Sequence, residues 1–140
     1  MGDAGLVTVA CELPVRETID RLAEAVIAAG LMVFARIDHA GNAAQAGLSL
    51  RPTELLIFGH PRGGTPLMAD RQTAGIDLPA KALAWEDADG RVWLTYTEAA
   101  WLAERHGLGP ESRAAVGAID LGLATVIGHA AAGGDPPPSR

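Results

Sequence analysis

The sequence predicts a single two-layer α/β (α+β) domain, in which a mixed β-sheet of about five strands packs against helices. Three observations support this fold class. Short β-rich runs alternate with segments of helical periodicity. Glycines and an Asp-Gly pair separate these segments as helix stops and a hairpin turn. The 140 residues suit one hydrophobic core, which we expect over residues 1–132, before a disordered Gly/Pro-rich tail over 133–140.

The N-terminal part predicts a strand, a helix and a second strand. Residues 6–13 are β-rich. Apolar side chains then recur at helical spacing over 15–29, with Pro14 at the first helical position and Gly30 as the stop. The apolar run 31–37 follows, which suggests a strand–helix–strand unit that folds back on one sheet.

Three further elements lead through the middle of the chain. Asp38 is expected to cap a short helix over 39–46, whose many alanines suit close packing against a flat surface. The nearly continuous apolar run 54–58 is typical of a central strand that is covered on both faces. Thr65 as N-cap and Pro66 as first helical residue then predict a helix start.

The C-terminal part predicts a β-hairpin followed by two helices. Strands over 81–86 and 91–96 flank the turn Asp89-Gly90, whose residues tolerate positive φ. A helix over 98–105 and a longer one from about Ser112 follow. The complete order is β-α-β-α-β-α-β-β-α-α.

Composition and charge exclude several classes of protein. Eleven basic against seventeen acidic side chains give a net charge of -6, so we expect neither nucleic acid nor an anionic membrane as partner. The first residues lack the features of a signal peptide, and no apolar run approaches the length of a membrane span. The one cysteine, Cys11, excludes an internal disulfide and is more simply a buried apolar residue than a reactive thiol. We therefore expect a cytoplasmic protein.

A series of short motifs runs through the middle of the chain. Its members are Pro52-Thr53, residues 55–59, Pro61, residues 64–68, Asp77-Leu78-Pro79, Lys81, residues 85–87, Asp89-Gly90, Val92-Trp93 and Tyr96. In this order and spacing they resemble the family catalogued as domain of unknown function 302, over roughly residues 6 to 130. The resemblance implies a compact α/β sandwich, commonly a homodimer, with no established activity and no catalytic residues. Much of that family is expected to have Asn where this chain has His60, which weighs against catalysis by His60.

The best candidate for a ligand site is the glycine-rich turn over residues 59–66, between an apolar strand and a helix start. Backbone N–H groups at a helix start attract anions, and Arg62 supplies a forked donor for phosphate or carboxylate. The residues that would bind the ligand are His60, Arg62, Gly63, Gly64 and Thr65. No Gly-Lys-Ser/Thr follows, which excludes a Walker loop. The same glycines would equally suit a tight turn without a ligand.

Two other functions stay open. A small acid–base enzyme, a hydrolase or an isomerase, would use His60 or Asp77 with Lys81, although no nucleophile stands beside a base. A purely structural dimer would bind nothing. Independently of these functions, Trp93 lies on the strand face opposite Val92. There it would either pack across the strands with Trp85 and Tyr96, or contact a second subunit or line a pocket. The histidines show no metal-ligand spacing, so we expect neither a metal nor a cofactor. The leading hypothesis is a non-enzymatic homodimer that binds a small anionic ligand.

Overall fold

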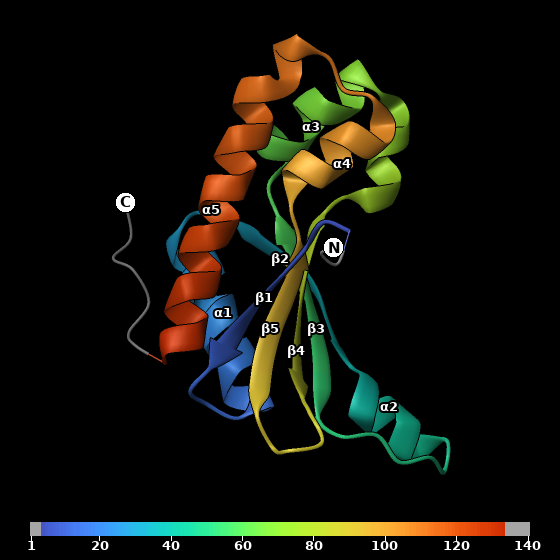
Figure 1. The fold of residues 1–140 in the computed structure, drawn as a ribbon, viewed down its shortest axis with the longest axis vertical. Coiled ribbons are helices and arrows are strands. Elements are labelled where there is room, and N and C mark those ends of the chain that lie inside the picture. The colour runs from blue at the N-terminus through green and yellow to red at the C-terminus, as the bar shows by residue number, and fades with distance from the viewer. Residues whose placement is uncertain (1–3, 134–140) are drawn as a thin grey trace.

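Five strands form one sheet in the computed structural model, which describes residues 4–133 (Figure 1). The elements confirm the predicted fold class and order. They are β1 (Leu6–Cys11), α1 (Val15–Ala28), β2 (Met32–Asp38), α2 (His39–Gln45), β3 (Thr53–Gly59), α3 (Pro61–Asp70), η1 (Gln72–Asp77), β4 (Ala80–Glu86), β5 (Val92–Thr97), α4 (Ala99–His106), η2 (Pro110–Ser112) and α5 (Arg113–Ala132). Apart from Gly133, the tail predicted over 133–140 lies outside the described residues.

The strands lie in the order β1-β5-β4-β3-β2, and each neighbouring pair is antiparallel. The sheet is therefore antiparallel throughout, and the expectation of a mixed sheet was wrong. β1 and β2 point in the same direction but lie at opposite edges, because β5, β4 and β3 fill the space between them. The connection through α1 therefore crosses the whole sheet, which position in the sequence alone did not indicate.

β3 lies next to the edge strand β2, and its two faces differ in burial. Leu56 and Phe58 are fully buried on the face toward the helices, whereas Leu55 and Ile57 on the other face are half-buried. The prediction of a central strand covered on both faces was therefore wrong. A strand in a two-layer fold can be apolar on both faces while helices cover only one of them.

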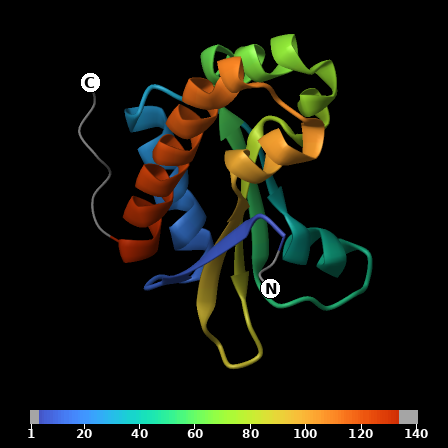
Figure 2. The same cartoon turned by 45° about the horizontal axis from the view of Figure 1, so that its top comes forward.

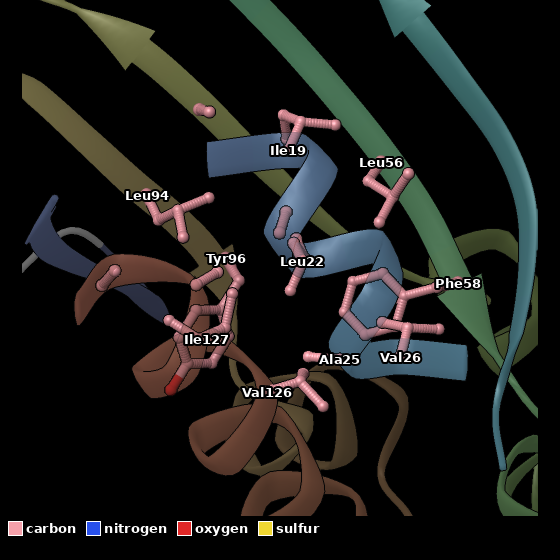
Figure 3. Close-up of a cluster of buried hydrophobic side chains, with 14 of the residues drawn as sticks. Ile19, Leu22, Ala25, Val26, Leu56, Phe58, Leu94, Tyr96, Val126 and Ile127 are labelled. Carbon is pink, nitrogen blue, oxygen red and sulfur yellow. The ribbon is translucent and has the colours of Figure 1, made fainter. Parts of the chain in front are cut away.

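The main core lies between the sheet and the helices α1 and α5 (Figure 3). Ile19 and Leu22 of α1 meet Leu56 of β3, Leu94 of β5 and Val126 of α5, and each of these side chains is at most 1% exposed. Helical spacing and strand alternation bring these residues to one layer. Full burial of each such side chain stabilises the fold by roughly 1.5–3 kcal/mol.

A second, smaller core lies beyond one end of the sheet. Its buried members are Leu67, Ala74, Ala99, Leu102 and Val116, from α3, η1, α4 and the start of α5. Figure 2 shows these elements gathered at the end of the strands, apart from the region where α1 covers the sheet. The end of β3 and the start of α3 therefore lie near the junction of the two cores.

α2 contributes no buried residue to either core. Asp38 caps it as predicted, because its side chain accepts a hydrogen bond from the Gly41 N–H at 2.9 Å. The alanines of α2 were expected to pack against a flat surface, and this expectation was wrong. Figure 1 shows the reason: α2 projects from the end of the sheet opposite to α3 and α4.

Pro110–Ala132, which includes all of α5, is long and apolar enough to cross a membrane by length and composition. The sequence reading found no such segment, because glycine, alanine and threonine interrupt its apolar runs without adding charge. In the fold, one face of α5 packs into the domain through Leu123, Val126 and Ile127, whereas Leu121 is 72% exposed. A core helix meets the same criterion of length and composition.

Candidate functional site

The glycine-rich segment that was predicted as a turn is the first part of α3. The helix begins at Pro61, with His60 as N-cap, and Pro66 lies inside it. The prediction of a helix start at Thr65 and Pro66 was therefore wrong. Both prolines satisfy the local rule for a first helical residue. The structure uses the earlier one, and the first turn of α3 then packs beside α5: a Cβ at Gly63 would be in ordinary contact with the Ile119 side chain, at 3.6 Å.

The backbone N–H groups at this helix start are already engaged. The Arg62 N–H donates to Nδ1 of His60 at 3.1 Å. The N–H groups of Gly63 and Gly64 donate to the His60 carbonyl oxygen at 2.9 and 3.2 Å, and Pro61 has no N–H. An anion at this place would consequently meet side chains rather than a cradle of free backbone donors.

His60 presents one hydrogen-bond donor of its own. A neutral imidazole has one nitrogen that accepts and one that carries the proton. Because Nδ1 accepts from the Arg62 N–H, the proton of the neutral ring lies on Nε2. Within the described part of the chain, no hydrogen bond involves Nε2 of His60. This N–H is therefore available to a ligand.

A cavity of about 660 Å³ lies beside the start of α3. Phe58 and Leu123, both buried, contribute to it from β3 and α5, and the half-buried Met68, Leu78 and Ile119 form further parts of its wall. Its volume falls in the range of roughly 300–1,000 Å³ that is usual for small-molecule sites. The cavity thus has room for an organic molecule.

All five residues that the sequence singled out as ligand contacts line this cavity: His60, Arg62, Gly63, Gly64 and Thr65. Arg62 and Thr65 are exposed and His60 is half-buried, so the polar side chains stand at the rim. Among residues 4–133, no side chain forms a hydrogen bond or an ion pair with the Arg62 guanidinium. The rim therefore carries an uncompensated positive charge.

The residues of the acid–base alternative do not meet in one site. His60 lines the cavity, whereas Asp77, Lys81 and Tyr96 do not. Lys81 is exposed on the sheet face away from the helices, and its Nζ donates to the Pro79 carbonyl oxygen at 3.3 Å. The groups that would have to exchange a proton therefore do not share this cavity.

Asp77 instead belongs to a polar cluster that joins η1 to α4. Its Oδ2 lies 2.6 Å from Nε2 of His106, and both of its carboxylate oxygens lie 3.0 Å from the Arg105 guanidinium. The Thr73 hydroxyl lies 3.0 Å from Nδ1 of His106. Sequence reasoning missed His106, since no motif links it to Asp77. Residues 4–133 contain no group of three His, Cys, Asp or Glu side chains that could hold a metal ion.

Trp93 lies on the strand face opposite the buried Val92, as the alternation predicted. Its indole Nε1–H donates to Oδ2 of Asp87 at 2.9 Å, and its ring centroid lies 6.3 Å from that of Trp85. It also lines a second cavity of about 510 Å³, together with Cys11. Trp93 therefore lines a pocket, which is one of the roles predicted for it. Another predicted role, a contact with a second subunit, stays a prediction.

Burial raises the pKa of the Cys11 thiol to about 11, against the smaller lowering effect of a hydrogen bond with Thr18. A thiol with so high a pKa carries little thiolate near neutral pH and is a poor nucleophile. This agrees with the interpretation of Cys11 as a packing residue.

Curated relatives of the chain come from Brucella species. "Fluoride-specific ion channel FluC 1" of Brucella suis biovar 1 (strain 1330) is 53% identical over 129 residues, which cover 92% of this chain and 51% of that protein. The protein of the same name from Brucella abortus biovar 1 (strain 9-941) is also 53% identical, with 48% of its length covered. The chain thus spans about half the length of the curated relatives it matches.

A solved structure and a family model match the same fold. "Crystal structure of uncharacterized conserved protein DUF302 from Bacillus stearothermophilus" superposes with a TM-score of 0.80 at 19% identity, over 91% of this chain and 99% of that one. At this identity the likeness concerns the fold alone. The model of the family described as "Domain of unknown function DUF302" matches residues 7–126. The chain belongs to this DUF302 family.

Proposed function

We propose that the chain is a homodimeric module that binds a small anionic molecule in the 660 Å³ cavity and performs no chemistry on it. The observation that carries this proposal is the Arg62 guanidinium, which stands at the cavity rim without a protein partner in the described residues. The Nε2–H of His60 and the Thr65 hydroxyl supply neutral donors beside it. In a chain of net charge -6, this rim is a local exception that favours an anion.

Anion-dependent thermal stability tests this proposal. A ligand that binds only the folded state raises the melting temperature as its concentration rises. Acetate, phosphate and longer organic acids are compared at constant ionic strength for the wild type, Arg62→Ala and Arg91→Ala. Arg91 is an exposed arginine that does not line this cavity. Stabilisation that is lost in Arg62→Ala alone supports the proposal, and its absence for every anion contradicts it.

The sheet face away from α1 and α5 supports the dimer in this proposal. Leu55, Ile57, Leu83, Trp85 and Trp93 are half-buried side chains on this face. A contiguous apolar sheet surface of this kind is typical of a contact between subunits. Light scattering coupled to gel filtration is expected to give twice the chain mass of 14.4 kDa, and a smaller mass for Leu83→Glu. A dimer that binds no anion would favour the purely structural alternative.

The relatives named as fluoride-specific channels favour a second candidate function. The region similar to this chain makes up about half of each of those proteins. We propose that this chain acts on, or beside, a channel of that class as a ligand-responsive domain on the cytoplasmic side. Fluoride itself fits the cavity poorly, because a small hydrated anion needs several converging donors and these walls are mostly apolar.

Fluoride tolerance of cells tests this second candidate. The Brucella suis relative is expressed at full length and with the region similar to this chain deleted. A change in fluoride tolerance at equal channel abundance supports a role beside the channel. Equal tolerance of the two forms contradicts it and leaves the ligand-binding proposal to its own test.

A further inference from the structure

We infer that the ligand of the 660 Å³ cavity is an amphipathic carboxylate, with a single anionic head at Arg62 and a hydrocarbon body against the apolar walls. This inference rests on the proposed function, since it names the class of anion that the site would take.

The walls of the cavity are apolar except at the rim. Among the described residues that line it, only His60, Arg62 and Thr65 have polar side chains, and none of these lining residues is acidic. The inner surface comes from residues such as Phe58, Leu78 and Leu123. A small inorganic anion would leave this surface in contact with water, whereas a hydrocarbon body would cover it.

Phe34 gives the cavity an exposed aromatic ring. It lines the cavity from β2 and remains 46% exposed, at an irregularity in the pairing of β2 with β3 between Val33 and Ala35. A large exposed aromatic side chain beside an apolar cavity is a typical feature of a binding site. A ligand body that extends from the cavity floor toward Phe34 would bury this ring.

The positive charge at the rim limits how much negative charge the head group of the ligand can carry. Within residues 4–133, Arg62 is the one arginine or lysine that lines the cavity, and its planar guanidinium matches a carboxylate with two parallel hydrogen bonds. A polyphosphate would leave most of its charge uncompensated there. One carboxylate matches the one cation, and Nε2–H of His60 can bind the same head.

Gly122 marks where the ligand body would lie. It lines the cavity from the middle of α5, and a Cβ at this position would meet no atom within 4 Å. A larger side chain there would project into the cavity. Gly128 is a matched control, because it lies in the same helix with the same open space and does not line the cavity.

Calorimetric titration of the full chain tests the inference with straight-chain carboxylates from butanoate to decanoate, below their micelle concentrations. Affinity is expected to rise roughly fourfold for each added methylene until the cavity is full. Arg62→Ala is expected to lower the affinity for octanoate by about tenfold or more and to change the affinity for 1-octanol by less than about twofold. Gly122→Leu is expected to lower the affinity for both ligands, whereas Gly128→Leu is expected to change neither affinity.

Ala118→Leu provides a second cavity-filling variant should Gly122→Leu melt far below the wild type, because Ala118 is exposed and lines the same cavity. Equal affinity for butanoate and decanoate, with the Arg62 effect retained, would overturn the amphipathic ligand and keep the anion site. Binding that both filling variants leave unchanged would place the ligand elsewhere and overturn the inference. No binding of any carboxylate, in wild type or variants, would overturn the inference, whereas the proposed function falls only if phosphate also fails to stabilise the chain in the thermal test.

Discussion

The carboxylate of Asp77 lies 2.6 Å from Nε2 of His106 and takes no part in the cavity at the start of α3. A carboxylate can only accept, so the Nε2–H of His106 donates to it. The His106 side chain is only 8% exposed, and Arg105 completes the contact on the solvent side. The pair joins η1 to α4 beside the smaller core. Asp77 therefore braces the contact between η1 and α4, whereas the sequence left a structural role and an acid–base role open for it.

His106→Ala is expected to lower the free energy of unfolding by about 1–3 kcal/mol, because it removes two hydrogen bonds from a nearly buried ring. Urea denaturation measures this change. Lys81→Ala is the control: Lys81 is exposed, and its replacement is expected to change stability by less than about 0.5 kcal/mol. A larger loss of stability in Lys81→Ala than in His106→Ala would contradict the structural assignment of Asp77.

Asp120→Ala is expected to destabilise the domain by about 0.5–2 kcal/mol, as the loss of a helix cap does. The N-cap residue of α4, Glu98, makes no capping bond with its side chain. Asp120 of α5 accepts instead from the N–H groups of Ala99 and Ala100, at 2.7 and 3.0 Å. Thermal unfolding of Asp120→Ala and Asp120→Asn checks this, with the smaller loss expected for Asn. Equal stability of Asp120→Ala and wild type would contradict the cap.

The pKa of Tyr96 depends on the charge of the Asp120 carboxylate. Burial raises the pKa of Tyr96 above its ordinary value of 10.0, and the negative charges of Asp120 and Glu98 raise it further. Asp120→Asn is therefore expected to lower the pKa of Tyr96 toward 10.0, without reaching it. Ultraviolet titration is unambiguous because the chain has one tyrosine. Asp89→Asn, in the hairpin turn at the far end of β5, is expected to leave this pKa unchanged.

Replacement by alanine is expected to change the free energy of unfolding in opposite directions at two glycines. Gly128→Ala is expected to raise the free energy of unfolding by roughly 0.5–1 kcal/mol, because Gly128 lies within α5 and a Cβ there meets nothing. Gly107→Ala is expected to lower it by about 1–2 kcal/mol, since Gly107 ends α4 with φ of 65°. Chemical denaturation measures both. A destabilised Gly128→Ala would indicate that this helix face is covered by another subunit.

Local signals placed most elements correctly. Asp38 caps α2, and Gly90 has the positive φ of 82° that the hairpin turn requires. The start of α3 was predicted too late in the chain, because Pro61 and Pro66 satisfy the same local rule. Local signals do not decide between them, and in the structure α3 starts at Pro61 and packs beside Ile119. The candidate residues at 60 and 62–65 nevertheless line one cavity, since consecutive residues stay together however the helix begins.

The sequence by itself determined the order of the elements and the face on which each strand residue lies, because both depend on spacing within a few residues. Val92 points to the core and Trp93 away from it for that reason. The tertiary structure alone decided which distant residues meet: Asp77 with His106 rather than Lys81, and Phe34 with Gly122 around one cavity. Those contacts depend on strand order and helix packing, which local periodicity does not encode.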